Sequence, residues 1–173
     1  MVIWLIGLSG AGKTTIGRHV YELMKKEASN TVIVDGDEIR TIFKHDRGSD
    51  PYTIKERRRN ADRICEICAW LERQDINVVC SILSIFEESR IWNRHTYSKY
   101  FEVYISVTLE TLMKRDKKNL YAPALQGKIK NVVGIDIPFI PPENPDYILD
   151  NNNDDIDFKT VAADILAHAK TIN

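Results

Sequence analysis

Near its start the chain contains the segment Val2-Ile3-Trp4-Leu5-Ile6-Gly7-Leu8-Ser9-Gly10-Ala11-Gly12-Lys13-Thr14. Residues 2–6 are all apolar, which is typical of a strand that is buried on both faces of a parallel sheet. After the glycines, apolar residues recur at Ile16, Val20 and Leu23, so an amphipathic helix begins near Thr14. A buried strand, a glycine-rich turn and a helix in this order predict the first unit of an α/β domain.

The turn itself, residues 7–14, fits the pattern G-x-x-x-x-G-K-[ST]. Its glycines let the backbone curl until successive N–H groups point inward at a phosphate, and the helix that follows adds the positive end of its dipole. Lys13 then reaches the β and γ phosphates, while the Thr14 hydroxyl is a ligand for Mg²⁺. A glycine-rich turn without a ligand is the alternative, but the strand before the turn and the helix after it favour a nucleotide site. We expect nucleotide contacts from Gly7, Ser9, Gly10, Ala11, Gly12, Lys13, Thr14 and Thr15.

The rest of the chain alternates short strands with amphipathic helices. Strands are predicted at residues 31–34, 78–83, 101–107 and 147–149, and helices at residues 54–73, at 109–115 and from about Phe158 onward. This alternation predicts a doubly wound parallel sheet, the arrangement of P-loop NTPases and kinases, in a single domain over residues 1–173. Residues 116–144 lack periodicity and contain several lysines, so they are predicted to form a mobile lid. Residues 151–155 are interpreted as a polar turn.

Composition narrows the classes of function. With 173 residues, 43% hydrophobic and 28% charged, the chain has ordinary globular composition, and its net charge of −1 argues against binding a nucleic-acid polymer. No apolar run approaches the roughly 18 residues of a membrane helix, so we expect no membrane partner. Three cysteines are too few for a disulfide framework and indicate a reducing cytoplasm. Cys65 and Cys68 share a predicted apolar helix face, which favours core packing over a metal site.

A phosphate loop alone does not distinguish kinases from GTPases or motor ATPases. The chain has no Asn-Lys-x-Asp motif for guanine, and it is short for a motor ATPase. Its size and its lysine-containing lid favour a kinase for a small molecule, in which lid closure keeps water away from the γ phosphate. A nucleotide-binding regulator without turnover is the alternative from a different class.

Two acids follow the second predicted strand, in Asp35-Gly36-Asp37. Carboxylates at the carboxyl end of a strand lie where ligands bind in open α/β sheets, so one acid could orient or deprotonate an acceptor hydroxyl. A turn with a helix cap is the alternative. Arg57 and Asn60 lie three residues apart on one helix face, and arginine suits the oxygens of phosphate or sulfate. Arg58 and Arg59 are interpreted as a solvated basic face.

Several colinear segments together resemble the adenylyl-sulfate kinase family. They are residues 7–15, Asp35-Gly36-Asp37 with Arg40, Arg57 with Asn60 and Arg63, Leu83-Ser84, Arg115-Asp116, Lys118 with Leu120-Tyr121, Gly127-x-Ile129-Lys130, Gly134-Ile135-Asp136 and Pro142-Glu143-Asn144-Pro145. The match covers nearly the whole chain, and its later segments are more specific than the phosphate loop. The resemblance implies a P-loop kinase that moves the γ-phosphoryl group of ATP, with Mg²⁺, to the 3′-hydroxyl of a small-molecule nucleotide.

The resemblance also implies roles for individual residues. Lys13 and Asp35 are the expected catalytic residues, in which Asp35 serves the 3′-hydroxyl and Asp37 supports it. Arg115 is expected at the ATP site, and Thr14 is expected to hold the metal ion. The acceptor is expected to contact Asp35, Asp37, Arg40, Tyr52, Arg57, Asn60, Ser84, Lys118, Leu120, Val132, Ile135 and Asp136. A homodimer is left open by the sequence.

Departures from the family pattern concern the acceptor base. Family members clamp adenine between two aromatic rings, and here one ring position is Tyr52 but the other is Val132, where the family has Phe. The family's Ser-Pro-Tyr is replaced by Ser84-Ile85-Phe86. A stacked ring contributes roughly 1–3 kcal/mol by analogy with single-stranded nucleic acids, so its loss favours a smaller pyrimidine.

This combination resembles the cytidine diphosphoramidate kinases of bacterial capsule synthesis. Phosphoramidate and sulfate are similar in size and shape, so Arg40 and Arg57 would hold either 5′ group in the same way. The reshaped base position suits cytosine, which is smaller than adenine. Cytidine diphosphoramidate is therefore the leading acceptor, and adenylyl sulfate is the alternative.

Overall fold

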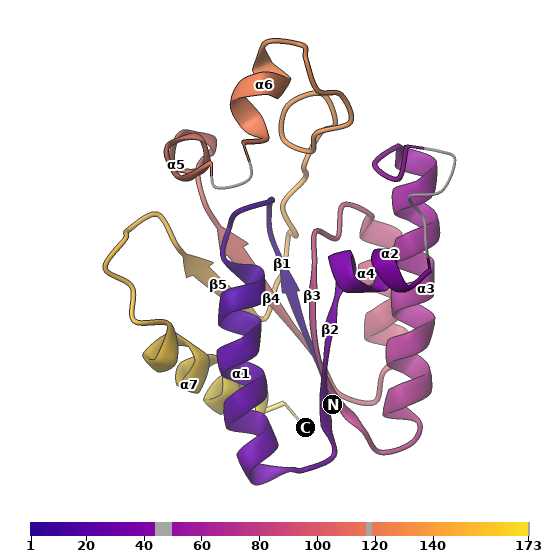
Figure 1. The fold of residues 1–173 in the computed structure, drawn as a ribbon. Coiled ribbons are helices and arrows are strands. Elements are labelled where there is room, and N and C mark those ends of the chain that lie inside the picture. Colours follow the sequence, from indigo (N-terminus) through magenta and orange to yellow (C-terminus); the bar gives the residue numbers. More distant parts are fainter. Residues whose placement is uncertain (44–49, 117–118, 173) are drawn as a thin grey trace.

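The computed structural model describes residues 1–43, 50–116 and 119–172. In these ranges the chain forms a five-stranded sheet in the order β2-β3-β1-β4-β5 (Figure 1). The strands are β1 (Val2–Ile6), β2 (Thr31–Asp35), β3 (Asn77–Ile82), β4 (Tyr100–Ser106) and β5 (Tyr147–Asp150). Each strand runs parallel to its neighbours, which confirms the predicted doubly wound α/β sheet.

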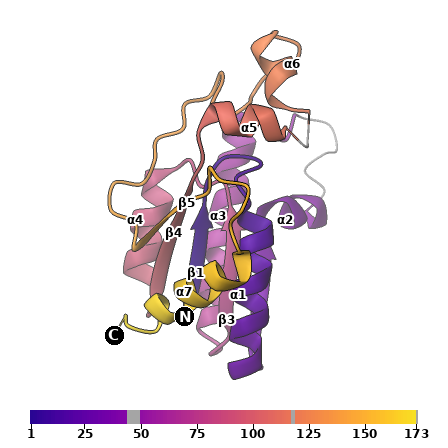
Figure 2. The same cartoon turned by 90° about the vertical axis from the view of Figure 1, so that its left-hand side faces the viewer.

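Helices cover both faces of this sheet. The helices in the described ranges are α1 (Lys13–Glu27), α2 (Gly36–Ile42), α3 (Ile54–Glu72), α4 (Glu87–Thr96), α5 (Leu109–Arg115), α6 (Tyr121–Leu125) and α7 (Phe158–Ala169). α1 and α7 lie on one face and α3 and α4 on the other, while α5 and α6 lie beyond the carboxyl end of β1 (Figure 1, Figure 2). No helix within the described ranges is long and apolar enough to cross a membrane.

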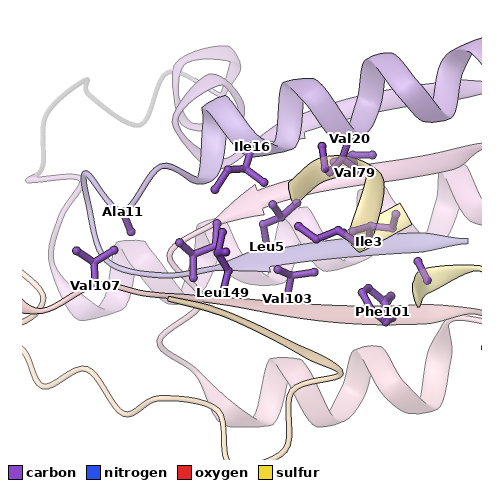
Figure 3. Close-up of a cluster of buried hydrophobic side chains, with 14 of the residues drawn as sticks. Ile3, Leu5, Ala11, Ile16, Val20, Val79, Phe101, Val103, Val107 and Leu149 are labelled. Atoms are coloured by element: carbon purple, nitrogen blue, oxygen red, sulfur yellow. The ribbon is translucent and has the colours of Figure 1, made fainter. Parts of the chain in front are cut away.

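The central strand β1 shows why the sheet is covered on both faces. Ile3 and Leu5 belong to a buried cluster with residues of α1 and α7, part of which is drawn in Figure 3. Val2, Trp4 and Ile6 belong to a second cluster with residues of α3. These five side chains are at most 1% exposed. The uninterrupted apolar run therefore reflects alternate residues that face two separate cores.

The strand order brings the functional segments to one edge of the sheet. From the central β1 the chain forms β2 and β3 on one side before it crosses to β4 and β5 on the other. Ligands in open α/β sheets bind outside the carboxyl ends of the strands, where the strand order reverses. The segments at the carboxyl ends of β1, β2, β3 and β5 therefore meet at this edge, namely residues 7–14, 35–37, 83–86 and 151–154.

Three short helices, α2, α4 and α6, have no counterpart in the ranges predicted from sequence. α6 lies within residues 116–144, which the sequence predicts as a lid without regular structure. Asp116 stabilises its start, because its carboxylate accepts the N–H groups of Leu120 at 2.8 Å and Tyr121 at 3.2 Å. This helix is five residues long, so it is too short for its apolar residues to show a helical period.

Candidate functional site

A cavity of about 760 Å³ lies at the carboxyl edge of the sheet and extends from the phosphate loop to the start of α3. It gathers most of the site residues predicted from sequence: Ser9, Gly10, Gly12, Lys13, Thr14, Thr15, Asp35, Asp37, Arg40, Tyr52, Arg57, Asn60, Ser84, Arg115, Leu120 and Val132. The predicted contacts Gly7, Ala11, Ile135 and Asp136 are not part of its lining. Lys118 lies outside the described residues. One continuous cavity thus holds both the predicted ATP site and the predicted acceptor site.

The phosphate loop has the backbone geometry that its glycines predict. Gly10 and Gly12 have φ values of +80° and +99°, in the left-handed region that glycine adopts without strain. Gly7 packs against β4, and a Cβ at this position would lie 2.7 Å from the carbonyl oxygen of Ile105. Lys13 Nζ donates a hydrogen bond to the carbonyl oxygen of Leu8 at 2.8 Å, so the ammonium group lies over the loop.

Thr14, which follows Lys13 in the chain, meets Asp35 in the wall of the cavity. Thr14 Oγ1 donates a hydrogen bond to Asp35 Oδ2 at 2.8 Å. A hydroxyl and a carboxylate are hard oxygen ligands of the kind that Mg²⁺ prefers, and Mg²⁺ sites usually combine one or two protein oxygens with substrate phosphates and water. These two residues therefore fit a magnesium ion bound together with ATP.

The second oxygen of Asp35 is also held. Asp35 Oδ1 accepts the N–H of Asp37 at 2.9 Å, which caps α2. Asp37 Oδ1 in turn accepts a hydrogen bond from Arg40 at 2.7 Å. The helix cap that the sequence offers as the alternative is therefore formed, and it fixes the Asp35 carboxylate in the cavity.

Arg57 connects two walls of the cavity at the end that contains Arg40, Arg57 and Asn60, called here the acceptor end because the acceptor is predicted to bind there. Its Nε donates to the carbonyl oxygen of Tyr52 at 2.7 Å, and its terminal nitrogen donates to the carbonyl oxygen of Asn131 at 2.8 Å. Burial lowers the pKa of Arg57, and the nearby charge of Arg40 lowers it further. Both guanidinium groups lie over the Tyr52 ring, at 5.0 Å for Arg40 and 5.4 Å for Arg57. Two cations thus concentrate positive charge where an anionic acceptor is expected.

Two polar side chains at the acceptor end are buried. Asn60 is 2% exposed, its Nδ2 donates to the carbonyl oxygen of Gly36 at 3.2 Å, and its Oδ1 has no hydrogen-bond partner among the described residues. Ser84 has a φ of +53°, an uncommon conformation for a residue with a side chain. Trp4 donates to its hydroxyl at 3.3 Å and Arg90 to its carbonyl oxygen at 3.1 Å. The free Asn60 oxygen suits a hydroxyl of a bound sugar.

Asp136 shapes the site without lining the cavity. Its carboxylate accepts the N–H groups of Asn131 and Val132, both at 2.6 Å. Burial raises the pKa of Asp136, but these backbone hydrogen bonds outweigh burial and lower the pKa overall. Val132 is 3% exposed and lines the cavity from this turn, while Ile135 packs against the core. Direct acceptor contact by Ile135 and Asp136 is thus not supported by their positions.

Sequence reasoning missed residues that hold the phosphate loop. Asn151 directly follows β5 and is 2% exposed, and its Nδ2 donates to the carbonyl oxygen of Ala11 at 2.8 Å. The Tyr121 hydroxyl donates to the carbonyl oxygen of Ser9 at 2.7 Å. The signal that identified Asp35, a polar residue at a strand's carboxyl end, also applies to Asn151.

Arg58 and Arg115 also position walls of the cavity. The Arg58 guanidinium lies 3.9 Å from the centre of the Phe86 ring and pairs with Glu88 at 3.0 Å, so Arg58 is not merely part of a solvated face. Arg115, predicted at the ATP site, bonds the carbonyl oxygen of Asn151 at 2.7 Å and Asp154 at 2.7 Å. Phe86 and Asp154 both line the cavity.

Comparison with known proteins agrees with this geometry. The family model for adenylylsulphate kinase matches residues 1–150. A protein from Aeropyrum pernix named "Probable adenylyl-sulfate kinase" is 37% identical over 161 residues, which cover 91% of this chain and 86% of that protein. A cytidine diphosphoramidate kinase from Campylobacter jejuni is 38% identical over 151 residues, which cover 87% of this chain and 86% of that protein.

A solved structure of an APS kinase also matches the fold of this chain. The structure of the Mycobacterium tuberculosis APS kinase in complex with AMPPNP and APS matches this chain with a TM-score of 0.84 and 28% identity. The match covers 98% of this chain and 97% of that one. Sequence and structure comparisons agree over nearly the whole chain, which therefore belongs to the adenylylsulphate kinase family.

Proposed function

We propose that this chain transfers the γ-phosphoryl group of ATP to the 3′-hydroxyl of a nucleotide that carries a small anionic 5′ group. The observation that carries the proposal is the continuous cavity, which has the phosphate loop at one end and Arg40, Arg57 and Asn60 at the other. Asp35 links these ends, because it accepts a hydrogen bond from Thr14 beside the phosphate loop and one from the N–H of Asp37, which pairs with Arg40. A donor phosphate and an acceptor hydroxyl would meet at this carboxylate. A regulator without turnover would not need this acceptor end.

The residues suggest a division of labour in the reaction. The amides of the phosphate loop and Lys13 bind the β and γ phosphates and stabilise charge on the transferring group. Asp35 orients the 3′-hydroxyl and accepts its proton as the new O–P bond forms and ADP leaves. When bound at Thr14 and Asp35, Mg²⁺ would supply further neutralisation of phosphate charge. Arg40 and Arg57 attract the 5′ group and so help to orient the reacting hydroxyl.

For the acceptor, we propose cytidine diphosphoramidate first. Val132 presents an aliphatic surface to the cavity at the position where the resemblance predicts a second aromatic ring. The Campylobacter jejuni relative is named for this substrate. Adenylyl sulfate is the second candidate, because Tyr52 retains one ring at the base end and other relatives are named adenylyl-sulfate kinases.

The cellular setting is part of the proposal. Cys65, Cys68 and Cys80 are buried free thiols, which suits the reducing cytoplasm in which we place the enzyme. A homodimer is compatible with the fold and is tested by the mass of the protein in solution.

The function is tested with a panel of nucleotides. Each candidate acceptor is incubated with ATP and Mg²⁺, and its mass is followed for the addition of one phosphoryl group. We expect acceptor-dependent formation of ADP and a 3′-phosphorylated product. ADP formation that is the same with and without every acceptor would contradict the proposal.

A further inference from the structure

The acceptor end of the cavity contains an amide whose orientation is set by a carboxylate. Asn131 lines the cavity beside Val132, and its Nδ2 lies 2.5 Å from Asp50 Oδ2. An ionised carboxylate only accepts hydrogen bonds, so the amide nitrogen faces Asp50 and the amide oxygen faces away from it. Among the described residues, none donates a hydrogen bond to Asn131 Oδ1.

Several contacts place this pair at the Tyr52 end of the cavity. Arg57 donates to the carbonyl oxygens of both Tyr52 and Asn131, so these two residues flank one guanidinium group. Asp50 Oδ1 accepts the N–H of Tyr52 at 2.9 Å. The carboxylate that orients Asn131 is therefore tied to the residue at which we expect the acceptor base to stack.

Asn131 is held in an uncommon backbone conformation. Its φ is +64°, and its N–H donates to Asp136 at 2.6 Å. Residues with side chains occupy this region at a cost, although asparagine tolerates it better than most, and they persist there where the surrounding structure holds them. Asp50, Arg57 and Asp136 together fix the backbone and the amide of Asn131.

We propose that Asn131 Oδ1 selects acceptor bases with an exocyclic amino group, and that Asp50 sets this selectivity. The N4 amino group of cytosine or the N6 amino group of adenine would donate a hydrogen bond to this oxygen. Uracil and hypoxanthine have a keto oxygen at this position. That oxygen and Asn131 Oδ1 are both acceptors, so no hydrogen bond would form and the two oxygens would repel each other. The inference rests on the proposed nucleotide kinase function and adds a criterion that applies to cytidine and adenosine acceptors alike.

The direct test uses acceptors that differ only in this group. We would measure kcat/KM for cytidine diphosphoramidate and its uridine counterpart, and for adenylyl sulfate and its inosine counterpart. In each pair that reacts, we expect the amino acceptor to be preferred by roughly tenfold or more, because a keto base would cover the half-buried Asn131 oxygen without donating to it. A separate comparison, of kcat/KM between the pyrimidine pair and the purine pair, shows which of the two base types the pocket binds.

The outcomes of this test are distinguishable. Equal kcat/KM values within a reacting pair overturn the base selectivity and leave the kinase function standing. No transfer to any of the four acceptors contradicts the kinase function, and the selectivity falls with it. A preference for the amino acceptor in either pair supports both.

The variant Asp50→Asn tests the role of the carboxylate. The new side chain keeps an oxygen for the Tyr52 N–H and turns an NH₂ group toward Asn131. Asn131 then rotates and presents its own NH₂ group to the cavity, so kcat/KM for the uridine acceptor should rise while that for the cytidine acceptor falls. If Asp50 only stabilised the loop, both values would fall together, and that result would overturn its assigned role.

The variant Asn131→Gly removes the amide and retains the backbone conformation, because glycine adopts positive φ without strain. We expect the preference between amino and keto acceptors to fall to near unity. Asn119→Gly is the matched control, since Asn119 has a φ of +47° in the same part of the chain but does not line the cavity. The control should retain the wild-type preference. An unchanged preference in Asn131→Gly would overturn the proposal.

Discussion

At the scale of single residues, the site depends on side chains that fix other groups as well as on those that face the cavity. Asp35 is held at both oxygens, by Thr14 and by the N–H of Asp37. Its two interpretations, helix cap and active-site acid, are therefore compatible. Holding the carboxylate in place lowers the cost of orienting an acceptor hydroxyl.

Lys13 allows a test of the donor site. Its ammonium group lies over the phosphate loop, where it would stabilise charge on the transferring phosphoryl group more than it stabilises bound ATP. We expect Lys13→Ala to lower kcat by roughly 10²-fold or more while the melting temperature stays close to that of the wild type. Near-normal turnover would show that this loop is not the phosphoryl donor site.

Asn151 allows a test of how the loop is held. Its amide is buried and donates to the carbonyl oxygen of Ala11. Asn151→Ala leaves that oxygen unpaired, so we expect a loss of about 1–3 kcal/mol in the free energy of unfolding. We also expect the KM for ATP to rise while the KM for the acceptor changes little. An equal rise in both would contradict a specific role at the phosphate loop.

Val132 allows a test of the acceptor base. If its position suits a pyrimidine, kcat/KM for cytidine diphosphoramidate should exceed that for adenylyl sulfate by more than about tenfold, equivalent to about 1.4 kcal/mol. Val132→Phe should narrow this difference by adding a ring for adenine. Arg57→Ala is the control. It should lower kcat/KM for both acceptors by the same factor, because Arg57 acts on the 5′ group and on the pocket walls that both acceptors share. A wild-type preference for adenylyl sulfate would contradict the pyrimidine assignment.

At the scale of elements, two carboxylates organise residues 116–144, the segment that the sequence predicts as a lid. Asp116 accepts the N–H groups that begin α6, and Asp136 accepts those of the turn that carries Val132. Each carboxylate gathers backbone N–H groups beside side chains that pack into the core, Tyr121 and Ala124 in α6 and Val132 in the turn. This combination explains how a stretch with little periodicity adopts defined structure. The lid therefore depends on the charge of these acids.

This dependence predicts the response of the lid to pH. Backbone hydrogen bonds, first that of Leu120, lower the pKa of Asp116 below its ordinary value of 3.8. A lowered pKa means that the carboxylate stabilises the folded lid above pH 3.8 and that this contribution is lost as the pH falls through the lower folded value. In an NMR titration, the Leu120 amide signal should therefore shift with a midpoint below 3.8. A midpoint at or above 3.8 would contradict the structural role of Asp116.

At the scale of the whole molecule, the sequence predicts what depends on local patterns. The apolar run of β1 and the glycine-rich motif after it are contiguous in the chain. A local pattern of this kind can be read from the sequence, and it predicts a buried strand of the sheet, the phosphate loop and therefore one end of the cavity. The pairs Asp50–Asn131 and Ala11–Asn151 join positions far apart in the chain. No sequence pattern shows such pairs, because they form only when packing brings their segments together. Short helices such as α2 and α6 were missed because they span too few residues for a period.

Phosphorylation of a matched pair of acceptors tests the central claim most directly. Cytidine diphosphoramidate and its 3′-deoxy analogue are each incubated with the enzyme, ATP and Mg²⁺, and adenylyl sulfate with its own 3′-deoxy analogue forms a second pair. Products are located by phosphorus NMR. The account predicts one new 3′-phosphate monoester and one ADP for each acceptor consumed in at least one pair, and no product from either deoxy analogue. Phosphorylation of the deoxy analogues, or a phosphate at any other position, would contradict it.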